Sequence, residues 1–301
     1  MSKKIYVIGS SNTDMVVKSE KLPVAGETIL GGTFLMNAGG KGANQAVAAA
    51  KLGANVTFVS KVGDDIFGKQ AIQGFQKEGI NTNFVFTDAE NPSGVALILV
   101  DAKGENSIAV ASGANGNLQI SEVAKAIEQI SANDIVLLQL EIPIPTVEFA
   151  IKKCSENGAK VILNPAPAQK LNENIFKFLE IITPNETEAE LLTGIKVTDL
   201  ESAKHAAEVL HQKGVKNIII TLGSRGAYLY NTNTNLLISA PQVQAVDTTA
   251  AGDVFNGALA VALSEGNEME QAINFACKAA AISVTRMGAQ ASAPLRSEIN
   301  F

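Results

Sequence analysis

The stretch DIVLLQLEIPIPTVEFAIKKCSENGAKVILN (residues 134–164) has two short apolar runs, one on either side of a helix-like segment. The runs DIVLLQL (134–140) and KVILN (160–164) are rich in aliphatic and β-branched residues, which is typical of buried strands. Between them, PTVEFAIKKCSENG (145–158) begins with Pro and ends with Gly, as helices prefer. A strand, a helix and a second strand in this order predict two parallel strands joined by a crossover helix.

The same alternation extends in both directions along the chain. Further strand-like runs are short and apolar, and they lie at 4–9, 55–60, 180–183 and 217–222. Further helix-like segments lie at 42–53 and 67–79, and the first of these ends in a Gly. Short apolar strands separated by helices predict an α/β protein with a parallel sheet that is buried on both faces.

Two segments interrupt this alternation. Residues 14–35 and 94–111 contain alternating apolar residues and hairpin-like turns such as AKGEN, without a helix-like segment. They predict a small β-sheet inserted into the α/β body. Because a flap of strands over a sheet edge is a common form of lid, we expect these segments to close over a binding site.

The composition is that of a globular protein. Apolar residues make up 46% of the 301 residues, charged residues make up 18%, and the net charge is −6. The acidic balance argues against a broad surface for nucleic acid or anionic membrane, and no apolar run approaches the roughly 20 residues that span a bilayer. The first apolar run is too short for a signal peptide. Two cysteines without a CxxC pattern fit a reducing cytosol and no structural zinc, so we expect a cytoplasmic protein.

The chain lacks the signatures of several common enzyme classes. GGKGAN (39–44) does not have the Walker A spacing, GSSNTD (9–14) follows the first strand in place of G-x-G-x-x-G, and no G-x-S-x-G occurs. His205 and His211 are six residues apart and face different sides of one helix-like segment. We expect both to be surface or packing residues.

The stretch DTTAAGDVFNG (247–257) places a carboxylate where a glycine turn enters an apolar, Ala-rich helix. The free N–H groups and the dipole at the start of such a helix attract an anion such as a phosphoryl group. Asp253 in the first turn therefore has two interpretations: it caps the helix, or it holds an alcohol in line for phosphoryl transfer. The dipole predicts a lowered pKa for Asp253, which a loose transition state tolerates.

Three motifs together resemble those of the pfkB, or ribokinase-type, carbohydrate kinases. DTTAAGDVFNGA (247–258) is similar to the family's C-terminal signature, AGGKGANQA (38–46) to its N-terminal signature, and PNETE (184–188) to its N-x-x-E motif. The resemblance runs nearly end to end. It implies a three-layer α/β/α sandwich of the ribokinase type over residues 1–301, as a single kinase domain with a mostly parallel sheet. The lid would be formed by about 14–35 and 94–111.

Within the family, GSSNTDMVV (9–17) and LLQLEIP (137–143) resemble the members that phosphorylate ribose. The implied reaction is transfer of a phosphoryl group from ATP to O5 of D-ribose, which gives ribose 5-phosphate. Asp253 would be the base, and the backbone amides of Ala250, Ala251 and Gly252 would form the anion hole. The implied sugar-binding residues, besides Asp253, are Asn12, Asp14, Gly39, Gly40, Lys41, Asn44 and Glu141.

Apart from Asn44, these sugar-side residues also have a plainer interpretation from the sequence alone. Asn12 and Asp14 are equally typical of an Asx turn. The two glycines fit an ordinary turn, Lys41 fits a solvated lysine at a helix start, and Glu141 fits a loop carboxylate before a proline.

The resemblance also implies a nucleotide site. Asn185 and Glu188 would organise Mg²⁺ around the phosphates of ATP, Glu188 through water, although PNETE is also typical of a capped helix start. Cys277 stands where many relatives have His or Asn, and a thiol hydrogen-bonds only weakly. The implied nucleotide-binding residues are Asn185, Glu188, Thr221, Gly223, Ser224, Gly226, Gly252 and Cys277.

A monovalent cation, usually K⁺, activates members of the family beside the anion hole. The ligands are mostly backbone carbonyls, which leave little signature in a sequence, and Asp247 is the charged member. Asp247 is otherwise an ordinary turn residue. The implied positions are Asp247, Thr249, Ser283, Arg286, Gly288 and Ser292. The family also implies a homodimer through the lid, since lid strands alone would leave unpaired edges.

Two alternatives to ribose phosphorylation stay open. The acceptor could be deoxyribose, another pentose, a hexose phosphate or a nucleoside. The polar cluster of Asn12, Asp14 and Glu141 suits a small polyol, and Phe34, Leu35 and Met36 are the candidates for stacking a base. The second alternative is a sugar-binding regulator that has lost catalysis, and the intact Asp253 argues against it.

Overall fold

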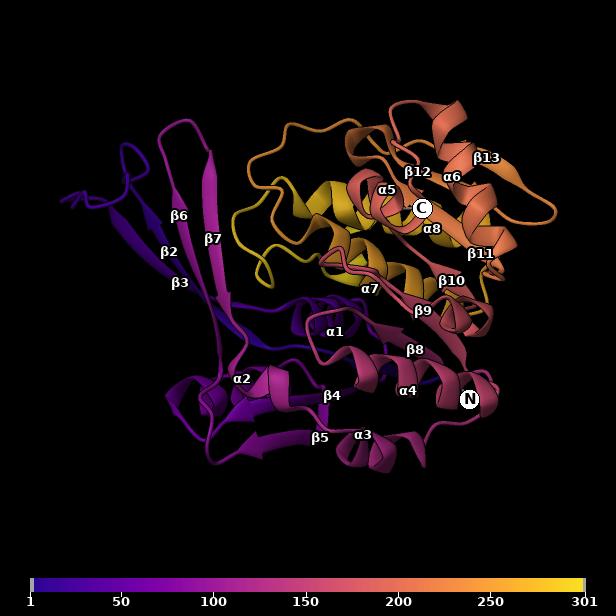
Figure 1. The fold of residues 1–301 in the computed structure, drawn as a ribbon, viewed down its shortest axis with the longest axis horizontal. Coiled ribbons are helices and arrows are strands. Elements are labelled where there is room, and N and C mark those ends of the chain that lie inside the picture. The colour runs from indigo at the N-terminus through magenta and orange to yellow at the C-terminus, as the bar shows by residue number, and fades with distance from the viewer. Residues whose placement is uncertain (1–2, 300–301) are drawn as a thin grey trace.

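The structure is a computed structural model, and it describes residues 3–299. A nine-stranded sheet forms its centre, with the strand order β13-β12-β11-β10-β9-β8-β1-β4-β5 (Figure 1). In chain order, the strands of this sheet are β1 (Ile5–Ile8), β4 (Val56–Gly63), β5 (Asn81–Asp88), β8 (Ile135–Leu138), β9 (Lys160–Leu163), β10 (Ile181–Ile182), β11 (Asn217–Thr221), β12 (Ala227–Tyr230) and β13 (Asn235–Ile238).

The sheet is parallel except at one edge. Neighbouring strands from β11 across to β5 are parallel, and β12 and β13 pair antiparallel beyond β11. The stretch 134–164 folds into β8, a helix and β9, with Ile135 opposite Lys160. The mostly parallel sheet predicted from the sequence is therefore confirmed.

Helices cover both faces of the sheet. Ile5 and Val7 of β1 belong to one buried apolar cluster, and Tyr6 and Ile8 belong to the other, because successive side chains of a strand point to opposite faces. The first cluster includes residues of α1 (Lys41–Lys51), α2 (Ile66–Lys77), α7 (Ala251–Ser264) and α8 (Met269–Ser283). The second includes residues of α3 (Ile120–Ile127), α4 (Ile144–Glu156), α5 (Glu186–Thr193) and α6 (Leu200–Gln212). These three layers are those expected. Within residues 3–299, no helix has the length and apolar character to cross a membrane.

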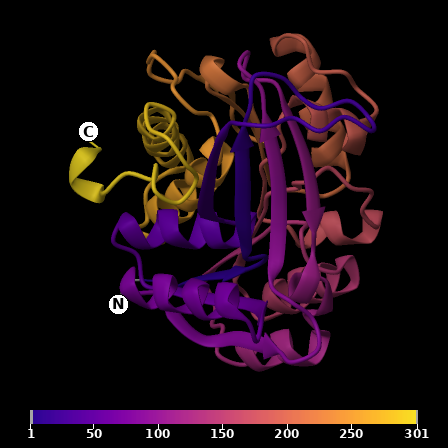
Figure 2. The ribbon, with the colours of Figure 1, turned by 90° about the vertical axis from the view of Figure 1, so that its left-hand side faces the viewer.

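A second, four-stranded sheet stands beside the body, at the left of Figure 1 and in front in Figure 2. Its order is β3-β2-β6-β7, and its strands are β2 (Asn12–Lys18), β3 (Thr33–Gly39), β6 (Gly94–Val100) and β7 (Asn106–Ala111). The inserted sheet is confirmed, but the bounds 14–35 were wrong for its first hairpin. The β2–β3 pairing begins at Asn12 and reaches Gly39, because these two residues are partners in the register.

Polar residues stand at the carboxyl ends of five adjacent parallel strands. The strands β11, β10, β9, β8 and β1 are neighbours in the sheet, and each has a polar residue at its last position or within two residues of its end. These residues are Thr221, Thr183, Asn164, Gln139 and Ser10. Because parallel strands end at one edge of a sheet, this edge is where a site is expected.

Candidate active site

Asp253 lies in the first turn of α7 and is only 6% exposed. Its Oδ2 accepts a hydrogen bond from Asn44 Nδ2 at 2.9 Å, and its Oδ1 accepts one from Gln45 Nε2 at 2.9 Å. Both donors belong to α1, so the carboxylate is held by another helix. The N-cap position of α7 is Ala250, and no side chain caps it. The capping interpretation of Asp253 is therefore wrong.

The pKa of Asp253 is raised, not lowered. Burial of the carboxyl raises it most, and nearby Glu141 raises it further. The Lys41 ammonium and the amides of Asn44 and Gln45 act in the opposite direction and offset only part of the effect. The expectation of a lowered pKa was wrong because it considered the helix dipole and not the desolvation of a carboxylate inside the fold.

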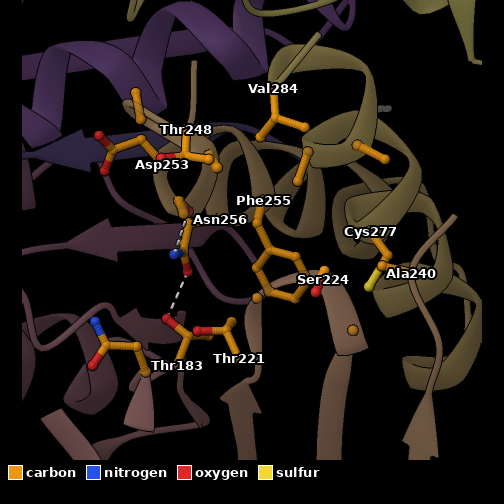
Figure 3. A pocket seen from close by; sticks show the side chains of 18 of the residues that line it. Thr183, Thr221, Ser224, Ala240, Thr248, Asp253, Phe255, Asn256, Cys277 and Val284 are labelled. Atoms are coloured by element: carbon orange, nitrogen blue, oxygen red, sulfur yellow. Dashed lines mark hydrogen bonds between the residues drawn. The ribbon is translucent and has the colours of Figure 1, made fainter. Parts of the chain in front are cut away.

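The start of α7 is tied to the sheet. Ala250 has a left-handed backbone conformation with φ 59°, and the Ala251 N–H donates to the Thr248 carbonyl at 3.2 Å. Asn256 Nδ2 donates to the Gly252 carbonyl at 2.8 Å, while Asn256 Oδ1 accepts from Thr183 Oγ1 at 2.7 Å (Figure 3). Of the three predicted anion-hole amides, that of Ala251 is engaged within the turn in this conformation, and a Cβ on Gly252 would meet open space.

The Lys41 side chain lies among four carboxylates at the start of α1. Burial acts to lower its pKa, but Asp253, Glu141, Glu188 and Asp14 together raise it above its ordinary value. The lysine is therefore a charged ammonium inside the site, and the interpretation as a solvated lysine is wrong.

Glu141 and the two glycines pack the start of α1 against β2. Glu141 Oε2 accepts hydrogen bonds from Ser10 Oγ at 2.5 Å and from the Lys41 N–H at 3.0 Å. Gly40 has φ +88°, and a Cβ there would lie 2.7 Å from the Asn12 nitrogen. A Cβ on Gly39 would lie 2.2 Å from the Asp14 carboxylate. Gly40 requires glycine because its φ is positive and the backbone of Ser11 and Asn12 passes too closely for a side chain. At Gly39, a side chain would displace the Asp14 carboxylate.

Asn12 is fixed by a residue that the sequence did not suggest. It is 8% exposed, and its Oδ1 accepts a hydrogen bond from Asn115 Nδ2 at 2.8 Å. Asn115 also accepts from the Ser11 N–H at 2.8 Å and donates to the Ser11 carbonyl at 3.0 Å. Asn115 lies in a 3₁₀ turn more than 100 positions along the chain, where the run GANGN is typical of an ordinary loop.

Asp14 lies beside the other acidic groups of the site. Burial, together with the charges of Glu141 and Asp253, raises its pKa to about 6, although Lys41 acts to lower it. Asp14 therefore titrates near neutral pH.

Asn44 carries a buried acceptor with no partner. Its side chain is 7% exposed, its Nδ2 is bonded to Asp253, and its Oδ1 has no hydrogen bond within the described part of the chain. An unsatisfied buried acceptor is unfavourable by about 1–3 kcal/mol, so it points to a donor on a ligand.

A cavity of about 470 Å³ borders Asp253. All eight residues predicted for the nucleotide line it, together with Lys41 and Asp253. Figure 3 shows Thr221, Ser224 and Cys277 around it. The sequence did not suggest several further lining residues, which are Thr183, Phe255, Asn256 and the segment 240–243. That segment has no polar motif, and only its position after β13 brings it to the cavity.

Asn185 and Glu188 cap a helix and also line the cavity. The Asn185 N–H donates to Glu188 Oε2 at 2.9 Å and the Glu188 N–H donates to Asn185 Oδ1 at 2.8 Å, which is a capping box for α5. Glu188 is nevertheless 7% exposed and lines the cavity. Burial raises the pKa of Glu188, partly offset by the Asn185 N–H and by Lys41.

Cys277 lines the cavity as an uncharged thiol. It is 3% exposed, and burial raises its pKa to about 12. Its contact with a nucleotide stays a prediction.

The two segments predicted for the monovalent cation come together. Asp247 Oδ1 accepts from the Thr249 N–H at 2.9 Å and Oδ2 from the Gly288 N–H at 2.9 Å. Although partial burial acts to raise it, these hydrogen bonds lower the pKa of Asp247. The Arg286 guanidinium pairs with Glu298 at 2.5 Å, and Ser283 and Ser292 donate to nearby carbonyls at 2.8 Å. Within residues 3–299, no group of three His, Cys, Asp or Glu side chains is arranged for a metal.

A buried carboxylate between a cluster of polar side chains and a cavity of nucleotide size is the arrangement expected of a small-molecule kinase. Lys41 and the start of α7 supply positive potential where a transferred phosphoryl group would lie.

Comparison with known proteins then gives the family: the chain belongs to the pfkB family of carbohydrate kinases, whose model matches residues 2–296. It is 47% identical to the ribokinase of Haemophilus influenzae over 99% of this chain and 97% of that protein. It is 40% identical to the deoxyribokinase of Salmonella typhimurium over 98% of this chain and 97% of that protein. The structure of Arabidopsis thaliana ribokinase complexed with ribose and ATP superposes with a TM-score of 0.89 at 35% identity, covering 99% and 97% of the two chains. The family and the ribokinase-type α/β fold predicted from the motifs are confirmed.

Proposed function

We propose that the chain is an ATP:D-ribose 5-phosphotransferase that converts D-ribose and ATP into ribose 5-phosphate and ADP. The observation that carries the proposal is the position of Asp253. Its carboxylate lies between the polar residues predicted for the sugar and the cavity predicted for the nucleotide, and it contacts side chains on the sugar side. The identity to proteins named ribokinase supports ribose as the acceptor.

The chemical step transfers the γ-phosphoryl group in line to O5 of ribose. The new O5–P bond forms as the bond from the γ-phosphorus to the leaving oxygen of ADP breaks. The O5 proton passes to Asp253, whose burial-raised pKa suits this role because an ordinary aspartate is a weaker base.

Positive groups would balance the negative charge of the transferred group. The Lys41 ammonium is surrounded by carboxylates that keep it charged. The free amides at the start of α7, those of Ala250 and Gly252 foremost, would donate to the phosphoryl oxygens. Release of the Ala251 N–H from Thr248 would add the third predicted donor.

The sugar side offers acceptors for hydroxyl groups. The unpartnered Asn44 Oδ1 and the carboxylates of Asp14 and Glu141 suit the hydroxyl donors of a small polyol. Asn12 and the glycine backbone at 39–40 complete this side, and Asn115 keeps Asn12 in place.

The donor set fits Mg²⁺ that is held mainly by water and phosphate oxygens. A single carboxylate, Glu188, faces the cavity beside Asn185, and Mg²⁺ usually keeps several waters. Glu188 would hold the ion through water, and bound Mg²⁺ would neutralise phosphate charge.

The two loops that meet at the hydrogen bond between Gly288 and Asp247 fit a large monovalent cation such as K⁺. The hydroxyls of Ser283 and Ser292 and the Arg286 guanidinium are engaged elsewhere. The proposed ligands are therefore the carbonyls at 247, 249, 283, 286, 288 and 292. Such an ion would fix the turn that enters α7.

The proposal includes one kinase domain over residues 1–301, whose four-stranded sheet is a lid and a homodimer contact. That sheet exposes Phe34, Met36, Leu97, Ile108 and Val110, and covering them by a second copy would remove apolar surface from water. Cys154 and Cys277 are free thiols, which is consistent with the cytoplasm. No nucleic-acid or membrane partner is proposed.

The test is ADP release from Mg·ATP with D-ribose, 2-deoxyribose, fructose, fructose 6-phosphate and adenosine, each with and without K⁺. Preference for ribose with stimulation by K⁺ is the expected result. Preference for 2-deoxyribose, the substrate class named for one relative, would keep Asp253 as the base and change the assignment of the sugar side. Ribose binding without any phosphorylation would favour the regulator.

A further inference from the structure

A buried chain of side-chain amides runs from the catalytic carboxylate into the centre of the sheet. Gln45 Nε2 donates to Asp253 Oδ1 at 2.9 Å and to Asn164 Oδ1 at 3.0 Å. Gln139 Nε2 donates to Gln45 Oε1 at 2.5 Å. Gln45 and Gln139 are 0% exposed, and neither lines the nucleotide cavity or was among the predicted site residues.

From this geometry, we propose that Gln45 is a positioning residue for Asp253, and that Gln139 fixes the orientation of Gln45. The proposal rests on Asp253 being the base of the proposed reaction. Neither glutamine touches a substrate in this account.

The orientation of the Gln45 amide follows from its neighbours. The atom that faces both Asp253 Oδ1 and Asn164 Oδ1 must be a donor, because two acceptor oxygens face it. Asn164 itself is oriented by donating to the Thr183 carbonyl at 3.4 Å. The other end of Gln45 is then the oxygen, and it meets the donor end of Gln139. A flipped Gln45 would break all three contacts.

The fold accepts one unfavourable feature to keep this chain of amides in place. Gln139 Oε1 is buried without a partner among the described residues, which is unfavourable by about 1–3 kcal/mol. Gly9 leaves space both for it and for the start of α1, because a Cβ there would lie 2.0 Å from Gln139 Oε1 and 2.9 Å from the Gly42 Cα. An apolar side chain at 139 would avoid the unpaired oxygen, so the donor end of Gln139 is the feature that explains its presence.

The chain acts on Asp253 in two ways. The hydrogen bond from Gln45 occupies Oδ1 of Asp253. Oδ2, which accepts from Asn44, is then the oxygen nearer the proposed sugar residues. The chain also stabilises the ionised form, since a donor to a carboxylate lowers its pKa. Other charged groups near Asp253 are Lys41, Glu141, Glu188 and Asp14, and all of them remain when Gln45 is changed.

The experiment measures kcat at saturating ribose and ATP against pH in the wild type, Gln45→Met and Gln139→Met, because kcat does not include the effect of Asp14 on the KM for ribose. Loss of the Gln45 donor should raise the pKa of the base by about one unit, because a hydrogen bond to a charged group is of that strength. The acidic limb should therefore move upward by about one pH unit in Gln45→Met. A shift in the same direction but smaller is expected for Gln139→Met, which leaves Gln45 bonded to Asp253.

Thr146→Val is the matched control, since Thr146 is 3% exposed and donates to the Leu118 carbonyl at 2.9 Å, away from this chain. Its acidic limb should match that of the wild type. A folded Gln45→Met protein with an unchanged acidic limb would overturn the proposal. If Gln45→Met does not fold, Gln139→Met decides, and an unchanged limb there has the same meaning. Failure of the wild type to phosphorylate any sugar would reject the proposed function without bearing on the pKa of Asp253, which ¹³C NMR of the labelled carboxyl groups would still report in each variant.

Discussion

Strands β8 and β7 both contain Ile and Val, but β8 is buried and β7 is exposed. In β8 the four residues IVLL are all 0% exposed. In β7 the six residues NSIAVA are all exposed, with Ile108 at 57%. Hydrophobicity alone therefore does not say which strand is in the core. The position of a strand in its sheet and the layers around that sheet decide its burial.

The same contrast separates two kinds of functional residue. Asp253 belongs to the nine-stranded body and is fixed by helices α1 and α7. Asp14 belongs to the four-stranded sheet, where it pairs with Asn37 of β3, and its carboxylate lies close to Gly39. We therefore expect the body to set the rate of chemistry and the four-stranded sheet to set the affinity for sugar. Variants of Asp253 and Asp14 test this division, and variants of Leu138 and Ile108 test the difference in burial.

The largest effect is expected for Asp253→Asn in the body. Because the amide cannot accept the hydroxyl proton, kcat should fall by roughly 10²–10⁴. The ribose KM should change little, since the shape of the site is kept. Steady-state kinetics with both substrates varied measures the two constants. Turnover close to that of the wild type would remove Asp253 from the mechanism and contradict the division of roles between the body and the four-stranded sheet.

The next effect compares truncation of a buried and an exposed aliphatic residue. Leu138→Ala in β8 should lower the free energy of unfolding by about 2–5 kcal/mol because it leaves a cavity. Ile108→Ala in β7 should lower it by less than about 0.5 kcal/mol at low protein concentration. Urea unfolding measures both.

Repeating the unfolding at high protein concentration sharpens this comparison. If two copies cover the four-stranded sheet, the wild type gains stability with concentration by mass action, and Ile108→Ala should gain less. Equal gains would place the dimer contact elsewhere, and no gain in either protein would argue against a dimer.

The smallest effect concerns Asp14 and depends on pH. The pKa of Asp14 is about 6 in the folded chain and lower when unfolded. The folded state therefore binds this proton more tightly, and the resulting stabilisation is full below about pH 4 and lost as pH rises through about 6. Asp14→Asn removes this dependence, so its Tm should exceed that of the wild type above pH 6, and the difference should shrink toward pH 4.

Asp14→Asn should weaken the binding of ribose, although it stabilises the fold above pH 6. The wild-type KM for ribose should rise as pH falls below about 6, because a protonated carboxyl loses acceptor capacity. In Asp14→Asn the KM for ribose should be raised by roughly tenfold at pH 7.5, with the KM for ATP nearly unchanged. Equal changes in both constants would mean that Asp14 is not a sugar ligand.

Much of this molecule was predictable because its signals are local. The parallel body follows from short apolar strands between capped helices, and the motifs at 38–46, 184–188 and 247–258 name the segments that meet at one sheet edge. The roles of individual side chains depend on partners far along the chain. Asn115 holds Asn12 across 103 positions, and Gln45 holds Asp253 across 208. The pKa of Asp253 was predicted in the wrong direction for the same reason, since its burial is a property of the assembled fold.

The cavity on the nucleotide side has one further consequence, for the order of events in a turnover. Among residues 3–299, those that line the cavity include none from β2, β3, β6 or β7, whereas Asn12, Asp14 and Gly39 lie in β2 and β3. We therefore expect ADP to leave by a route that the four-stranded sheet does not border. The residues proposed for the sugar would hold ribose 5-phosphate against that sheet. We therefore expect the product to leave when β2 and β3 move away, so that the stiffness of this hairpin, and not the chemistry at Asp253, sets how long the product stays bound.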